Sequence, residues 1–122
     1  MSPVRILLEK YKSPRATVFT GRPQGAAVRE ELKLDNIDRD QGSEVVFLVP
    51  NGVTSFNPSF YLGLLYPSFK KLGLDEFQKK YSFEFATTNV KTKQLLERDL
   101  RDGLRNAINS DQGRSILDIF KR

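Results

Sequence analysis

The apolar run at residues 45–49, VVFLV, constrains the fold of this chain more than any other stretch. A strand with one face in water alternates apolar and polar residues. An unbroken run of β-branched and aromatic residues is instead typical of a strand covered on both faces. The run therefore predicts a central sheet strand with other elements packed against both of its faces.

A loop and a helix are expected after this strand. Residues 50–52 (PNG) predict a turn. Asn57 and Pro58 are typical of an N-cap and a first helical residue, because the Asn side chain accepts a backbone N–H and proline has none to leave unpaired. Apolar residues then recur at helical spacing until Gly73, which is placed to end the helix. Pro67 predicts either a kink or an early end and a restart.

The other segments alternate between strand and helix patterns. Strands are expected at 4–8, 16–20 and 81–85, and helical segments at 24–34, 74–80 and 90–109. Turn chemistry at 12–15 favours a hairpin between the first two strands. In the last helix, Glu97 stands four residues from both Lys93 and Arg101, a spacing that favours ion pairs. The order of elements predicts an α/β protein with a parallel pair and an antiparallel hairpin, hence a mixed sheet.

The composition narrows the function. The 122 residues include no cysteine and no histidine, so the commonest general base, the commonest metal ligand and any thiolate are missing. We therefore expect no enzymatic activity and no metal site. No apolar run approaches the roughly 20 residues needed to span a bilayer, and the N-terminus lacks the pattern of a secretory signal. A cytoplasmic protein is the resulting expectation.

The length suits one domain with a core of its own. We assign residues 1–109 to an α/β domain and residues 110–122 to a C-terminal tail that forms a short helix. The apolar residues of this tail predict one of two roles. It either binds a partner as an amphipathic helix or packs against its own domain.

Several of these segments together resemble the STAS-like domain family, which is related to the STAS fold of anti-sigma-factor antagonists. The residues that carry the resemblance are the strand 45–49, the turn 51–53, the pairs 55–56 and 59–60, the helix residues 62–65, and Phe19 to Arg22 with Gly25. The resemblance implies a small mixed sheet of about four strands flanked by three main helices. It also implies a non-catalytic regulatory module that needs no cofactor and binds a protein partner, such as a kinase or ATPase of the GHKL type.

In the antagonist relatives, the partner kinase phosphorylates a serine at the start of this helix, and the added charge breaks the complex. The phosphoacceptor position of those relatives aligns here with Phe60, and Ser59 stands one residue earlier. Acids of the relatives are replaced by Leu48 and Pro58. We predict an interaction surface, with partner contacts or phosphorylation, from these residues: Thr54, Ser55, Asn57, Ser59 and Phe60. Arg22 is predicted to contact an anion or the partner.

Simpler roles compete with these assignments. Ser59 can serve only to cap the helix, Phe56 and Phe60 can belong to the core, and Arg22 can be an ordinary surface or ion-paired arginine. The net charge of +5 also supports an alternative function, nucleic-acid binding through a basic face. The lysines of that face would be Lys70, Lys71, Lys79, Lys80, Lys91 and Lys93.

Overall fold

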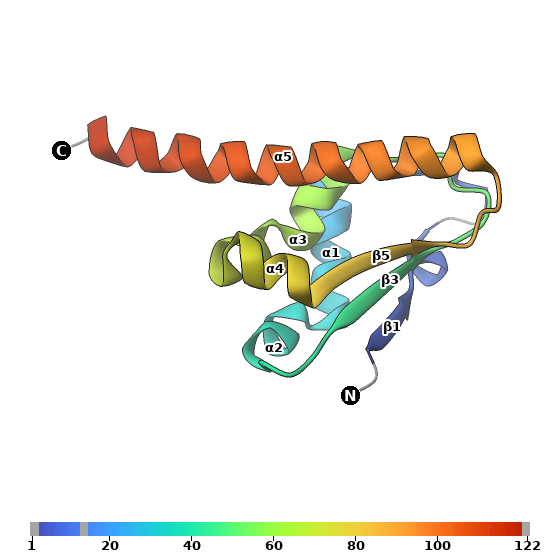
Figure 1. Cartoon of the computed structure of the whole chain (residues 1–122), viewed down its shortest axis with the longest axis horizontal. Coiled ribbons are helices and arrows are strands. Elements are labelled where there is room, and N and C mark those ends of the chain that lie inside the picture. The colour runs from blue at the N-terminus through green and yellow to red at the C-terminus, as the bar shows by residue number, and fades with distance from the viewer. Residues whose placement is uncertain (1–2, 13–14, 121–122) are drawn as a thin grey trace.

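The computed structural model describes residues 3–12 and 15–120, with side chains described as far as residue 110. The chain forms these elements in order: β1 (Val4–Leu7), the 3-10 helix η1 (Leu8–Tyr11), β2 (Val18–Phe19), α1 (Arg22–Leu32), α2 (Leu34–Arg39), β3 (Val45–Val49), β4 (Ser55–Phe56), α3 (Pro58–Leu72), α4 (Leu74–Lys80), β5 (Tyr81–Phe85) and α5 (Val90–Phe120). Figure 1 shows the sheet on one side of the molecule, with α1 and α3 behind it, α4 to the left of β5 and α5 running across the top.

The described strands form a three-stranded sheet in the order β1-β3-β5 and a separate two-stranded sheet of β2 and β4. Every pairing is parallel. The predicted α/β class is therefore confirmed, whereas the mixed sheet and the antiparallel hairpin are wrong. The reason is local: η1 follows β1 immediately and buries Leu8 completely, so β1 pairs with the apolar strand β3 instead of folding back on β2. Residues 13–14 of the predicted hairpin turn lie outside the described residues.

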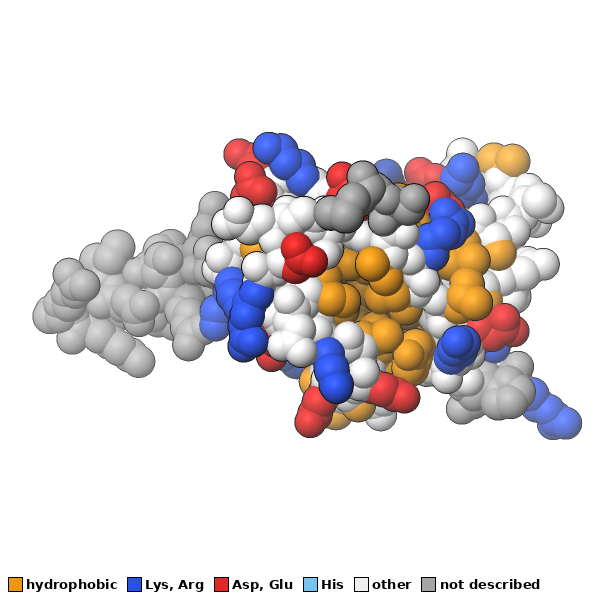
Figure 2. All heavy atoms as spheres, turned by 90° about the horizontal axis from the view of Figure 1, so that it is seen from below, with side chains coloured by type: hydrophobic (Ala, Val, Ile, Leu, Met, Phe, Trp, Pro, Cys, Tyr) orange, Lys and Arg blue, Asp and Glu red, His pale blue; other side chains and the backbone are white. Residues whose placement is uncertain are grey.

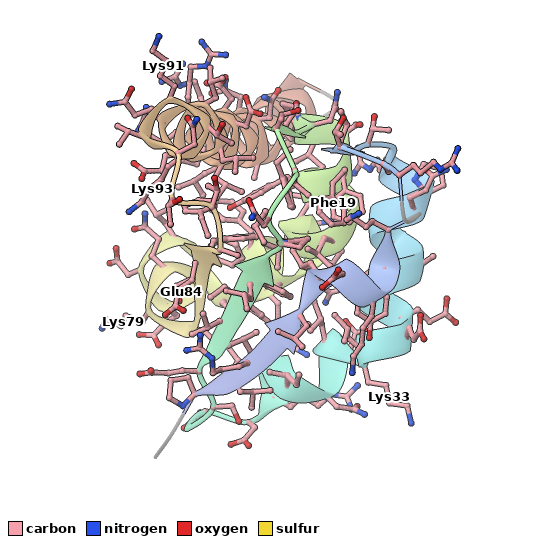
Figure 3. The ribbon with its side chains drawn as sticks, turned by 90° about the vertical axis from the view of Figure 1, so that its right-hand side faces the viewer. Phe19, Lys33, Lys79, Glu84, Lys91 and Lys93 are labelled. Carbon is pink, nitrogen blue, oxygen red and sulfur yellow. The ribbon has the colours of Figure 1, made fainter. Side chains whose placement is uncertain are left out.

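The helices cover only one face of the β1-β3-β5 sheet (Figures 1 and 3). Val45, Phe47 and Val49 point into that face and are at most 1% exposed. The expectation that β3 is covered on both faces is confirmed only in part, because on the opposite face Val46 is 8% exposed whereas Leu48 is half-buried.

Neighbouring strands shield the open face of β3 in place of a second layer of helices. Arg5 of β1 and Glu84 of β5 form an ion pair, with Nη2 and Oε2 2.7 Å apart, that reaches across β3. Long charged side chains cover apolar surface with their aliphatic stems, and Val46 beneath this ion pair is only 8% exposed. Figure 2 shows the molecule from the side opposite α5. Hydrophobic side chains gather at the centre of this side, with charged side chains around them.

The helices α1 and α3 touch through their backbones. A Cβ atom added to Gly25 would lie 2.2 Å from the Phe60 carbonyl oxygen, and one added to Gly63 would lie 2.1 Å from the Arg22 carbonyl oxygen. No side chain fits in either place, so this pair of glycines sets the distance between the two helices. The contact also brings the first turns of α1 and α3 together.

Two details of the helices differ from expectation. α3 is continuous from Pro58 to Leu72, so the predicted alternative of an early end and a restart at Pro67 is wrong. The predicted helix 90–109 is also longer than expected, since α5 runs without a break to Phe120. Along α5, Leu96 and Ala107 are buried and Gly103 lies against the Tyr61 ring, where a Cβ would come within 2.5 Å of Cγ.

Replacing Gly25 by alanine is expected to destabilise the protein by about 1–3 kcal/mol, because the added methyl group meets helix backbone rather than a flexible side chain. At an unhindered helical position the same change would stabilise by about 1 kcal/mol. Urea unfolding at equilibrium measures the difference. The exposed Glu30→Ala on the same helix serves as the control, and a stabilised Gly25→Ala variant would contradict the close helix contact.

Candidate functional site

The loop that leaves β3 is held in place by β2. The amides of Thr54 and Asn57 donate to the carbonyls of Thr17 and Phe19, both at 2.8 Å, on either side of the short β2–β4 pairing. The predicted surface residues are thereby fixed next to the start of α1. At this point the Gly21 amide donates to Ser59 Oγ at 3.2 Å and links the beginnings of the two helices.

Asn57 caps α3 as predicted, since its Oδ1 accepts from the Ser59 amide at 2.8 Å. Ser59 is half-buried and its hydroxyl is engaged twice: it donates to Asn57 Oδ1 at 2.6 Å and accepts from Gly21. The capping role that competed with modification of Ser59 is therefore present. Any reaction at this hydroxyl would have to break both hydrogen bonds.

Thr54 is the most open of the predicted hydroxyl residues. Its side chain is exposed and makes one long hydrogen bond, 3.4 Å, to the Thr17 carbonyl. Ser55 is half-buried, and its hydroxyl donates to Asp99 of α5 at 3.2 Å. Asp99 Oδ2 also accepts the Phe56 amide at 2.9 Å.

Asp99 is a residue that sequence reasoning missed. It fastens β4 and the loop to α5 through two hydrogen bonds that span more than 40 positions of sequence. A signal was available, because Asp99 follows Leu96 by three residues and so falls on the buried stripe of the helix. A carboxylate in such a position requires donors from another element.

Phe60 does not belong to the surface. It is 2% exposed, and its ring centroid lies 5.1 Å from that of Phe19 and 5.2 Å from that of Phe56. The prediction that Phe60 contacts a partner is wrong, and the competing interpretation, core packing, is confirmed for both Phe56 and Phe60. Neighbouring aromatic rings cover the rings of Phe56 and Phe60, so a partner protein has no access to them.

Arg22 remains exposed at the start of α1. Its guanidinium carbon lies 5.7 Å from the centroid of the Tyr66 ring, a cation–π distance. Among the described residues, no carboxylate comes within ion-pair distance of it. The guanidinium group is therefore held by a ring while its donors stay available to an anion.

The lysines of the predicted basic face differ in exposure and in partners. Lys80 is only 7% exposed, and its ammonium group donates to the carbonyls of Asp40 and Ser43. Lys79 has Glu76 at 3.7 Å, and Lys70 lies 5.4 Å from the Tyr66 ring centroid. Lys79, Lys91 and Lys93 lie on one side of the molecule in Figure 3, with Glu84 among them.

A second polar cluster is fully buried. Asp38 of α2 accepts from Arg29 at 3.0 Å, from Ser68 at 2.6 Å and from the Tyr81 hydroxyl. Arg29 also donates to the Leu64 carbonyl at 3.0 Å. Burial and the hydrogen bond with Asp38 raise the pKa of Tyr81 far above its usual value. Within the described residues no buried side-chain polar atom lacks a partner, so the polar groups of this cluster satisfy one another inside the protein.

Other features add no further chemistry. The described residues contain no group of His, Cys, Asp and Glu side chains arranged to hold a metal ion. None of the helices in the described part of the chain combines the length and apolar content required to cross a membrane. Comparisons of the chain with protein-family models, with curated proteins and with solved structures found no match.

Removing the carboxylate of Asp99 is expected to loosen the loop from α5. Asp99→Ala leaves the Phe56 amide and the Ser55 hydroxyl without their acceptor, which costs about 1–3 kcal/mol of stability. Hydrogen exchange at the Phe56 amide should accelerate at the same time. Asp102→Ala is the control on the same helix, because its exposed pair with Arg105, at 3.9 Å, contributes about 0–1 kcal/mol. Equal losses in the two variants would contradict the assigned role.

Asp38 and Asp35 form a matched pair for testing the buried cluster, because both bind Arg29. Asp38→Ala is expected to cost about 3–5 kcal/mol, since it leaves a buried guanidinium and two hydroxyls without their acceptor. Asp35 is 70% exposed, and Asp35→Ala should cost at most about 1 kcal/mol. Urea unfolding at pH 7 measures both variants.

The cost of Asp35→Ala should also depend on pH. The hydrogen bond and the charge of Arg29 lower the pKa of Asp35 below 3.8. A carboxyl group with a lowered pKa in the folded state stabilises the fold above its unfolded pKa and loses this effect as the pH falls through the folded value. The difference from the unaltered protein should thus shrink when the pH is lowered from 7 to 3. A difference that grows on acidification would contradict the ion pair.

Proposed function

We propose that this protein is a non-catalytic regulatory module, similar to an anti-sigma-factor antagonist, that binds a kinase-like ATPase. The surface would consist of Arg22, Thr54, Ser55, Asn57 and Ser59, which we call the loop surface. The observation that carries the proposal is the exposure of Thr54 and Arg22 on a backbone fixed by β2 and by Asp99. A surface fixed in advance loses little entropy when a partner docks on it.

The chemistry of the loop surface favours recognition over catalysis. It offers hydroxyl and amide groups and one guanidinium, and it includes no carboxylate, imidazole or thiolate. The Ser59 hydroxyl donates to Asn57 Oδ1 and accepts from the Gly21 amide, so the Asn57 carbonyl oxygen and the Ser59 hydroxyl are already occupied in maintaining the loop. Such groups can discriminate between partners but supply no general base.

The relation to the STAS fold is part of the same proposal. Its support is the helix that follows the inner strand β3, with the loop surface between them, and the parallel pairing of β3 with its neighbours. If phosphorylation regulates the module, Thr54 is the accessible hydroxyl, because Ser59 is engaged. A phosphate on Thr54 would add negative charge to the partner-facing side of the loop and would weaken an interface that includes carboxylates.

Affinity capture from the native host, followed by binding measurements with the captured protein after purification, tests the proposal. The expected partner hydrolyses or binds ATP. Arg22→Glu combined with Thr54→Glu is expected to weaken its binding at least about tenfold, or 1.4 kcal/mol. Lys33→Glu, at the far end of α1 (Figure 3), is the control for charge reversal and should leave binding unchanged.

Two results would overturn the proposal. One is a partner whose affinity does not depend on Arg22 and Thr54. The other is the alternative predicted from the net charge, that is, binding of duplex or single-stranded nucleic acid with an affinity that falls steeply as salt rises. The burial of Lys80 argues against this alternative, since it withdraws one charge from the predicted basic face.

A further inference from the structure

A groove runs between β5 and α5, on a part of the molecule distinct from the loop surface. Two adjoining hollows share Phe83, Leu100 and Arg101, and the larger, of about 650 Å³, extends to Phe85 and Lys93. We call the whole the β5 groove. In Figure 1, α5 passes above β5 and runs back along it, and Lys93 and Glu84 mark the two sides in Figure 3.

The floor of the groove is the margin of the hydrophobic core. Phe83 packs inward against Phe47, Phe56 and Tyr61, with ring centroids 5.2, 5.5 and 6.3 Å away. Its outer side, like Phe85 and Leu100, is only half-buried. Apolar surface of core character is thus accessible along this edge.

β5 is an edge strand, and one side of its backbone is unpaired among the described residues. β5 pairs only with β3. The Ala86 amide donates to the Val49 carbonyl at 2.9 Å, and backbone direction alternates along a strand. The N–H and C=O groups of Ser82 and Glu84 therefore point toward β3, and those of Phe83 and Phe85 point away, along the groove. These groups are the template on which another strand can form.

The wall of the groove carries cations without partners. The sequence predicted that Glu97 pairs with Lys93 and Arg101, but neither comes within ion-pair distance of it among the described residues. Lys93 and Arg101 are exposed, and Glu97 lies between them along α5. Eight residues of helix separate the two cations by about 12 Å along the axis.

From these observations, we propose that the β5 groove binds an extended acidic segment of a partner protein, which adds a strand to β5. Residues two apart in a strand are on one face, and residues four apart are about 13 Å apart. An acid–x–apolar–x–acid pattern would therefore place its acids near Lys93 and Arg101 and its apolar residue over Phe83 and Leu100. Glu97 disfavours an acid at the middle position. A second copy of this chain fits poorly, because it would bring the same cations against each other.

Binding of a labelled peptide, acetyl-Thr-Glu-Thr-Val-Thr-Glu-Thr-amide, to the full chain tests the proposal. Fluorescence anisotropy should show saturable binding, and replacing both Glu residues of the peptide by Lys should weaken it at least about tenfold, or 1.4 kcal/mol. Two further peptides are compared, one N-methylated at its odd-numbered amides and one at its even-numbered amides. They should bind unequally, because only one of the two sets of amides faces β5.

Variants of α5 identify the site. Lys93→Glu with Arg101→Glu should weaken binding at least about tenfold. Lys91→Glu with Arg98→Glu makes the same change of net charge at exposed positions outside the groove and should alter binding less than about twofold. By NMR, the Phe83 and Phe85 amides should exchange quickly in the free protein and be protected by the peptide.

Several outcomes would overturn the proposal. They are no binding of the peptide, equal losses in both pairs of variants, and no protection of the Phe83 and Phe85 amides. Protection of these amides without peptide, together with a dimer in analytical ultracentrifugation, would show that a second copy occupies the groove instead.

Discussion

The arrangement of the helices depends on the hydrogen bonds that the buried carboxylate of Asp38 accepts. This carboxylate accepts hydrogen bonds from Arg29 on α1, Ser68 on α3 and Tyr81 on β5, so four elements share one anion. Burying a charge is costly unless donors surround it, and here every buried side-chain polar atom of the described residues has a partner. A slip of any of these elements by one residue would leave a buried charge unpaired, which makes the arrangement specific rather than merely compact.

The close contact of Gly25 with α3 acts together with this cluster. The cluster ties the far ends of α1 and α3 through Arg29 and Ser68, and the glycines let the helix backbones meet near their beginnings. As a result, the first turns of both helices lie side by side, where Gly21 bonds to Ser59. The loop surface is a consequence of core packing, because its position is set by the buried contact between α1 and α3. The β5 groove has a different origin. It lies at the edge of the sheet, where no further strand of the described residues pairs with β5.

Local sequence patterns correctly predicted the features that depend on residues close together in the chain. Asn57 capped its helix as expected, and the strand at 45–49 and the helix after it lie where the apolar spacing placed them. The wrong predictions concern contacts between residues that are far apart in the sequence. One face of the run VVFLV has no helices over it, and the ion pair of Arg5 and Glu84, which are far from β3 in sequence, spans that face instead. Likewise, Phe60 was assigned to the interaction surface because it aligns with the phosphoacceptor position of the antagonist relatives, whereas its contacts with the rings of Phe19 and Phe56 place it in the core.

The sequence by itself determined the α/β class of the fold, the positions of β3 and α3, and the side-chain chemistry that a chain without cysteine and histidine can offer. Periodicity and capping act over a few residues, so they are visible in the order of side chains. Only the tertiary structure decided that β1 pairs with β3, that Asp99 holds the loop and that Lys93 and Arg101 stand without Glu97 beside an open strand edge. These features join residues far apart in the chain, and their energies depend on burial and distance, which no local pattern encodes.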